Sequence, residues 1–87
     1  MNVILMYDVQ ENKCAKLKKI CDNYLNHIQN SVYEGELSNL LLKQLKVKLD
    51  TIIDKNTDSI IIFTTNNPKW LIKEVIGVEK NNFSNFI

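Results

Sequence analysis

The chain has 87 residues, which leaves room for one compact domain, and 45% of them are hydrophobic, as in a globular rather than a disordered protein. All eleven basic residues are lysines and the net charge is only +1, so bulk charge does not indicate a nucleic-acid-binding protein. No stretch approaches the roughly 20 apolar residues of a membrane helix, and the apolar run after Met1 is too short for a signal peptide, so we expect a cytoplasmic protein that contacts no membrane.

The first third of the chain predicts a strand followed by a helix. Residues 3–9 form an apolar, partly β-branched run that is typical of a buried strand. An amphipathic helix is expected over residues 12–25, with Asn12 as its N-cap. Cys14 and Cys21 lie two turns apart in this helix, roughly 10 Å by the helix rise, which is too far for a disulfide. We therefore interpret them as small buried hydrophobic residues in a reducing compartment.

The rest of the chain predicts a second helix between short strands. Residues 28–37 partly alternate between apolar and polar and are interrupted by Gly35, so we expect a short strand, a bend and another short strand. Ser38 can cap the second helix. The broad apolar face of that helix carries Leu41, Leu42, Leu45, Leu49, Ile52 and Ile53. After a turn at residues 56–58, residues 59–65 predict a strand that is apolar on both faces, and therefore central or covered. Residues 74–78 predict a last short strand.

This order of elements predicts an α+β fold. The elements match the ferredoxin-like βαββαβ arrangement followed by an extra C-terminal strand. This arrangement has one antiparallel sheet with both helices on one face. We expect one domain over residues 1–80 and a C-terminal tail over residues 81–87. The open face of the sheet needs a cover, which a homodimer packed face to face would supply, and the extra strand could extend the partner's sheet.

Four short strings, the last two close together in the chain, resemble a known family. They are MYDV at residues 6–9, QNSVYEGEL at residues 29–37, and KW with EVIG at residues 69–70 and 74–77. They resemble the Cas-two family of small CRISPR adaptation proteins, which usually has phenylalanine where Tyr33 stands and often has arginines where the first helix here has lysines. The resemblance implies a ferredoxin-like homodimer that joins the CRISPR integrase subunit in spacer acquisition, and a Mg²⁺-dependent endonuclease activity that varies between members.

Asp8, at the end of the first predicted strand, is the candidate catalytic and metal-binding residue. Taken alone, an aspartate at a strand end more often accepts hydrogen bonds from the amides of the following loop. The resemblance implies metal binding at Asp8, but one carboxylate is a poor site because Mg²⁺ takes about six oxygens near 2.1 Å. We therefore expect one Mg²⁺ shared across the dimer, with Asp8 from each subunit, that polarises a phosphate or activates a water.

Five residues are candidates for contact with nucleic acid: Lys13, Lys16, Lys19, His27 and Tyr33. The lysines could form an ordinary solvated helix face, but a homodimer doubles them and two copies could straddle a duplex backbone. A lone histidine is more often structural than a general acid, and a tyrosine at this position more often belongs to the core, although its ring could stack on a base. Without arginine we expect recognition of shape and backbone rather than of sequence.

The C-terminal tail carries a second candidate contact surface. Phe83, Phe86 and Ile87 are costly to leave in water, and a seven-residue tail cannot bury them alone. One interpretation is a frayed terminus. The other, which we favour, is that these three residues dock on the partner subunit or on the CRISPR integrase.

The sequence leaves several functions open. One is a metal-dependent phosphodiesterase acting on RNA or DNA. Another, favoured as the biological role, is an architectural homodimer that bridges integrase units and holds double-stranded DNA without required chemistry; single-stranded RNA is a further expected partner. A small regulatory domain that binds a metabolite would call for glycine-rich loops, and the chain has only two glycines. A toxin-like ribonuclease of related fold is the last alternative.

Overall fold

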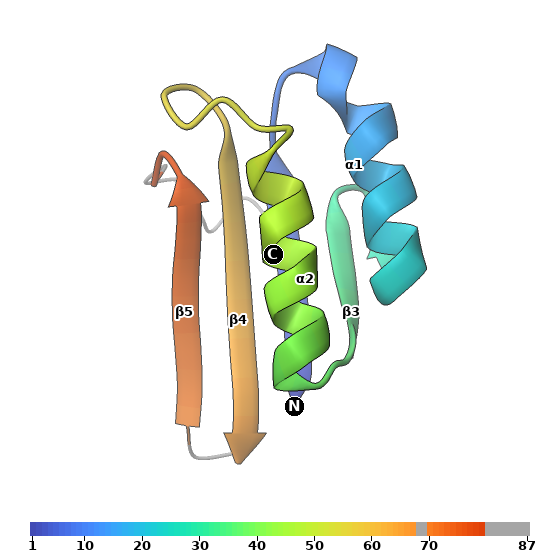
Figure 1. The fold of residues 1–87 in the computed structure, drawn as a ribbon, viewed down its shortest axis with the longest axis vertical. Coiled ribbons are helices and arrows are strands. Elements are labelled where there is room, and N and C mark those ends of the chain that lie inside the picture. The colour runs from blue at the N-terminus through green and yellow to red at the C-terminus, as the bar shows by residue number, and fades with distance from the viewer. Residues whose placement is uncertain (68–69, 80–87) are drawn as a thin grey trace.

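The computed structural model describes residues 1–67 and 70–79. In chain order the elements are β1 (Asn2–Asp8), α1 (Glu11–Tyr24), β2 (Asn26–Gln29), β3 (Val32–Glu36), α2 (Asn39–Asp50), β4 (Ser59–Asn67) and β5 (Trp70–Gly77). The five strands form one sheet in the order β2-β3-β1-β4-β5, and every neighbouring pair is antiparallel. Both helices cover the same face of this sheet (Figure 1). The predicted ferredoxin-like α+β fold is confirmed. Residues 81–87, with the predicted contacts of Phe83, Phe86 and Ile87, lie outside the described residues.

The strand register separates a helix-facing side of the sheet from an open side. Leu5 pairs with Tyr33 on β3 and with Ile62 on β4, and all three side chains are fully buried against the helices. Ile4, the neighbour of Leu5, points to the open side, where it pairs with Phe63 and keeps 38% of its surface exposed. The helix-facing core also contains Val3, Tyr7, Leu17, Cys21, Leu25, Leu37, Leu42, Leu45, Leu49, Ile53 and Ile60.

The two cysteines are free thiols, as predicted. Cys21 is fully buried in the core beneath α1, and Cys14, on the same helix, is partly buried against that core. Burial raises the pKa of Cys21 to about 12, so its thiol stays protonated near neutral pH. Within the described part of the chain, neither helix is long and apolar enough to cross a membrane.

The structure corrects the predicted bend at Gly35. The chain turns instead at Asn30 and Ser31, and Asn30 adopts a positive φ of 45°, which asparagine tolerates better than most residues. Gly35 lies inside β3, opposite Val3. A Cβ atom there would lie 3.0 Å from Leu25 Cδ2 and 3.5 Å from Leu25 Cα. Gly35 therefore serves the close approach of Leu25 to the strand rather than a bend.

Several element ends also differ from the prediction. The first helix has Gln10 at its N-cap position with no side-chain cap, so the predicted cap Asn12 is wrong. The second helix confirms the predicted cap, because Ser38 Oγ accepts a hydrogen bond from the Leu41 N–H at 3.2 Å. This helix ends at Asp50, so the two isoleucines at positions 52 and 53 pack from the following loop rather than from the helix. The last strand begins at residue 70, earlier than predicted, because its first residues already pair with β4.

Candidate metal and nucleic-acid site

Asp8 is the last residue of β1, and it is exposed. It pairs with Ser59 at the start of β4. Because side chains alternate along a strand and Tyr7 belongs to the helix-facing core, Asp8 belongs to the open side of the sheet. The turn between β2 and β3 reaches the same end of the sheet, since the Tyr7 N–H donates to the Ser31 carbonyl at 3.2 Å. Asp8 therefore stands at an accessible strand end, as predicted.

A single subunit offers Asp8 too few companions for a complete metal site. Within residues 1–67 and 70–79, no group of three or more His, Cys, Asp or Glu side chains lies close enough to hold a metal ion. The carboxylate oxygens of Asp8 are the donor type that Mg²⁺ prefers, but Mg²⁺ takes about six oxygens and usually binds through one or two carboxylates with several waters. The carboxylate oxygens therefore fit Mg²⁺ as a donor type, but the described residues of one subunit supply too few such groups for a complete site.

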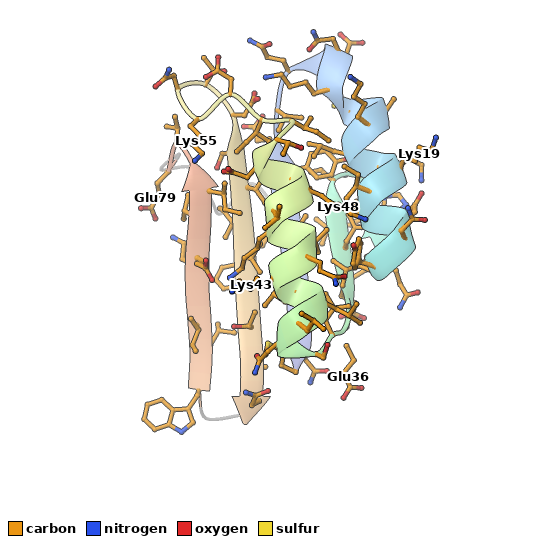
Figure 2. The ribbon with its side chains drawn as sticks, viewed as in Figure 1. Lys19, Glu36, Lys43, Lys48, Lys55 and Glu79 are labelled. Carbon is orange, nitrogen blue, oxygen red and sulfur yellow. The ribbon has the colours of Figure 1, made fainter. Side chains whose placement is uncertain are left out.

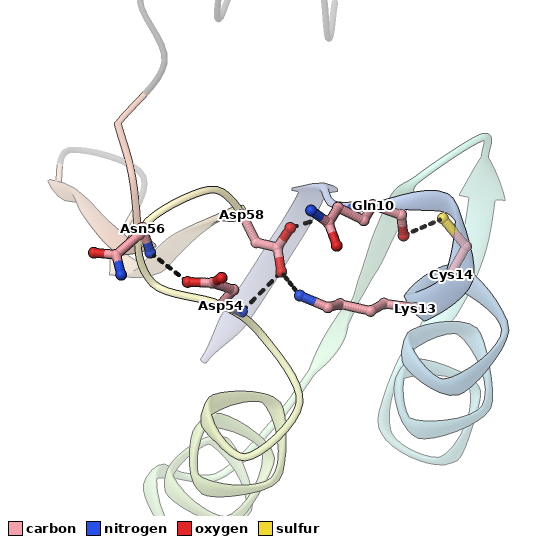
Figure 3. Close-up of polar contacts among 6 residues, drawn as sticks. All are labelled: Gln10, Lys13, Cys14, Asp54, Asn56 and Asp58. Carbon is pink, nitrogen blue, oxygen red and sulfur yellow. Dashed lines mark hydrogen bonds and ion pairs between the residues drawn. The ribbon is translucent and has the colours of Figure 1, made fainter.

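The structure adds a residue that the sequence analysis treated only as part of a turn, Asp58. Its side chain is 1% exposed. One carboxylate oxygen, Oδ2, accepts from Lys13 Nζ at 2.5 Å and from the Asp54 N–H at 2.8 Å, and the other, Oδ1, accepts from the Gln10 N–H at 3.2 Å. Figure 3 shows the carboxylate between Gln10 and Lys13 on one side and Asp54 on the other. It thus joins the loop before α1 to the loop before β4.

The hydrogen bonds of Asp58 keep its carboxylate ionised. Burial by itself would raise the pKa of this group. The hydrogen bond and charge of Lys13, together with the backbone N–H groups of Asp54 and Gln10, outweigh that effect and hold the pKa of Asp58 below its ordinary value. Local sequence patterns carry no signal for this cluster, because Lys13 and Gln10 lie 45 and 48 residues from Asp58 along the chain.

The three candidate lysines of α1 have different surroundings. Lys13 is directed into the protein, with its side chain 18% exposed and its ammonium bound to Asp58, so the structure gives it an internal partner instead of the predicted phosphate. Lys16 and Lys19 are exposed, and neither has an ion-pair partner among the described residues. Figure 2 shows Lys19 on the outer side of α1. Only these two lysines stay available for the predicted contact with a nucleic-acid backbone.

The two aromatic candidates lie together on the helix-facing side of β2 and β3. The ring of Tyr33 is fully buried, 6.1 Å from the ring of Tyr7 and 4.8 Å from that of His27. Burial raises the pKa of Tyr33, and no face of its ring is open to a base in this structure. His27 itself is exposed, with Nε2 2.6 Å from the Asn30 carbonyl oxygen. Tyr33 is a core residue, and His27 braces the turn that lies near Asp8.

Comparison with known proteins identifies the family. The family described as "CRISPR associated protein Cas2" matches residues 1–71, which include both the strand that ends at Asp8 and the string at residues 29–37. The chain belongs to the Cas2 family. This confirms the predicted resemblance. The matched range also includes Asp58 and Lys13, the two residues of the buried ion pair.

Relatives and solved structures agree with this assignment. The "CRISPR-associated endoribonuclease Cas2" of Thermotoga maritima is 42% identical over 92% of both chains, and that of Pyrococcus furiosus is 37% identical over the full length of both. A crystal structure of a Cas2 protein has a TM-score of 0.74 and 34% identity, covering 93% of this chain and 91% of the other. The Streptococcus pyogenes Cas2 structure has a TM-score of 0.70 and 30% identity over 76% of this chain and 87% of its own.

Proposed function

We propose that two copies of this Cas2 chain form a homodimer that hydrolyses phosphodiester bonds in RNA, with one Mg²⁺ ion between the two Asp8 side chains. The position of Asp8 carries the proposal: an exposed carboxylate ends the central strand, and one chain by itself does not complete a metal site there within the described residues. RNA is the substrate class because the relatives in Thermotoga maritima and Pyrococcus furiosus are named endoribonucleases.

The apolar surface of the sheet supports the homodimer. The edge strand β5 begins with Trp70, Leu71 and Ile72, whose surfaces are 70%, 65% and 62% exposed. The open side of the sheet adds Ile4, and partly buried Phe63 lies beside it. Among the described residues no further strand pairs with the outer edge of β5. Exposed apolar residues on such an edge invite association with another chain, and a second copy would cover them.

The two Asp8 carboxylates would hold the ion in this dimer, together with water and phosphate oxygens of the substrate. Without a cation the two like charges would repel, and one carboxyl group would tend to stay protonated. Bound Mg²⁺ would supply polarisation of the phosphate and a more acidic water. Asp8 would position the ion, and the strand pairing of Asp8 with Ser59 would hold the carboxylate in place.

The direct test is cleavage by the purified protein. End-labelled single-stranded RNA and DNA of the same sequence are incubated with it in Mg²⁺ and, as the control, in excess EDTA. We expect fragments from RNA with Mg²⁺ and none with EDTA. If the RNA stays intact at every Mg²⁺ concentration, the nuclease function is wrong. If the RNA and the DNA oligonucleotide are cleaved equally, the substrate class is broader than RNA.

A second candidate function is architectural: the homodimer would bridge the CRISPR integrase subunit and hold double-stranded DNA without chemistry. The exposure of Lys16 and Lys19 on α1 favours it, because two subunits would present four exposed ammonium groups to a duplex. Figure 2 shows Lys19 on the outer side of α1. Such a surface would read the backbone rather than the bases. Asp8 would be dispensable for this function, which separates it from the first.

Reversing the charge of both lysines tests the duplex surface. We expect Lys16→Glu with Lys19→Glu to weaken binding to a DNA duplex and to reduce the salt slope, log K against log[salt], by about 0.9 for each phosphate that is no longer neutralised. The control is Lys43→Glu with Lys55→Glu, an equal charge change at exposed lysines of α2 and the following loop, of which Lys55 pairs with Asp50. If the control lowers affinity and slope as much as the α1 variant, the lysines act only through net charge and the proposed surface is wrong.

A further inference from the structure

We propose that Asp58 is a positioning residue for Asp8: through its ion pair with Lys13 and its hydrogen bond from Gln10, it fixes the chain segment that leaves the candidate metal site. This inference depends on the proposed function for the role of Asp8. The Asp58 carboxylate is buried and has no access to substrate. Its proposed role is to hold the exposed Asp8 carboxylate in the geometry that the metal needs.

Asp58 binds the loop after β1 at two points. Only Val9 separates Asp8 from Gln10, whose N–H donates to Asp58 Oδ1. Lys13, in the first turn of α1, binds Oδ2, and its own N–H donates to the Gln10 carbonyl at 2.9 Å. The segment that follows Asp8 is thus tied to one carboxylate at both its backbone and its first helical turn.

Two hydrogen bonds of the Asp58 backbone fix the position of this residue. Its N–H donates to the Asp54 carbonyl at 2.8 Å, and its own carbonyl accepts from the Val78 N–H at 2.8 Å. Gly77 lets the end of β5 come this close: its φ is +92°, and a Cβ atom there would lie 2.2 Å from the Asp58 carbonyl oxygen. The next residue, Ser59, pairs directly with Asp8. Asp58 is therefore connected to the end of β1 in two ways, through the Asp8–Ser59 strand pairing and through the hydrogen bond from Gln10.

A buried charge at position 58 is not explained by fold stability alone. Replacing a buried ion pair with apolar residues of similar volume is often neutral or stabilising, so stability does not require one. A carboxylate that accepts three directed hydrogen bonds specifies one arrangement of its partners, which apolar packing would not. Groups that hydrogen-bond directly to a metal ligand commonly change metal affinity by about 10–100-fold. Asp58 acts one step further away, through Gln10, so we expect an effect at the lower end of this range.

The test uses Asp58→Asn, which keeps the side-chain shape but removes the charge that binds Lys13. We expect the full-length variant to bind Mn²⁺, the spectroscopic probe used in place of Mg²⁺, about 10-fold more weakly than wild type by electron paramagnetic resonance. In RNA cleavage we expect kcat to fall with little change in KM. In the metal-free protein we expect hydrogen exchange at the Gln10 amide to accelerate about 10-fold, whereas core amides of β4 stay protected.

Four further variants make this test decisive. Asp22→Asn, which removes the exposed partner of Lys18 on the same helix, should change none of the readouts. If Asp58→Asn does not fold, Lys13→Gln breaks the same ion pair, and Lys13→Arg should preserve the metal affinity and exchange protection that Lys13→Gln removes. Unchanged Mn²⁺ affinity and Gln10 exchange in a folded variant would overturn the inference. If Asp8→Asn binds Mn²⁺ as tightly as wild type, the proposed metal site is wrong. The hydrogen-exchange data would still test whether Asp58 holds the segment that follows Asp8.

Discussion

Asp8→Asn lowers Mg²⁺-dependent RNA cleavage by at least about 100-fold and leaves the protein folded; this is the largest effect that we expect on activity. A metal ion typically stabilises the charge of the transition state by several kcal/mol, and each 1.36 kcal/mol corresponds to about tenfold in rate. The fold should tolerate the change because Asp8 is an exposed residue at a strand end. Cleavage rates and the circular dichroism spectrum of both proteins measure the two parts of this prediction.

Mixed dimers distinguish a shared ion from two independent sites. Wild-type and Asp8→Asn chains, mixed in equal amounts and allowed to exchange subunits, should retain about a quarter of the wild-type activity if each ion needs both Asp8 side chains, and about half if each subunit works alone. Asp22→Asn is the control for removal of a surface carboxylate and should keep full activity in every mixture. Retention of about half would refute the shared site while leaving Asp8 as a ligand.

Asp58→Ala gives the largest effect that we expect on stability, a decrease of about 3–5 kcal/mol in the free energy of unfolding, because it leaves Lys13 and two backbone N–H groups without their acceptor. Urea unfolding at pH 7 measures this change. Asp22→Ala, which breaks the exposed Lys18–Asp22 pair on α1, should cost less than about 1 kcal/mol. Equal decreases in the two variants would mean that the Asp58 ion pair contributes no more than a surface pair.

The pH dependence of the same variant follows from the lowered pKa of Asp58. Above the ordinary aspartate pKa of about 3.9 the group is ionised in both the folded and the unfolded chain, and its stabilisation is fully present. As the pH falls toward the lower pKa of the folded protein, the unfolded chain takes up the proton first, so the wild type loses this stabilisation. The stability difference between wild type and Asp58→Ala, measured by urea unfolding at a series of pH values, should therefore shrink only below about pH 4.

Local sequence patterns predicted the structure correctly where neighbouring residues determine it. The run Ile60-Ile61-Ile62 predicted an interior strand because it is apolar on both faces, and β4 lies between β1 and β5 with all three residues buried. Ser38 predicted a helix start because its cap reaches only three residues ahead. The string at residues 29–37 carried the Cas2 resemblance that the family match confirms.

Contacts between distant segments could not be predicted in this way. Gly35 suggested a bend, but its role depends on Leu25, which comes close only once α1 has packed on the sheet. Lys13 looked like one of several surface lysines, and Asp58 like a turn residue; their pairing exists only after residues 45 positions apart meet. Sequence patterns therefore suggested Asp8 as a candidate but gave no indication of Asp58, which we propose supports it.

The place of β1 in the sheet has a consequence for how the molecule could evolve or be engineered. This strand is third of five and is bonded along its length to β3 and β4, whereas β2 and β5 form the rims. A strand at a rim pairs on one side only and opens more readily than a strand in the middle of a sheet. Substitutions at the exposed residues 70–72, at the end of β5 away from Gly77, could therefore change which molecules this Cas2 protein binds without disturbing the strand that carries Asp8.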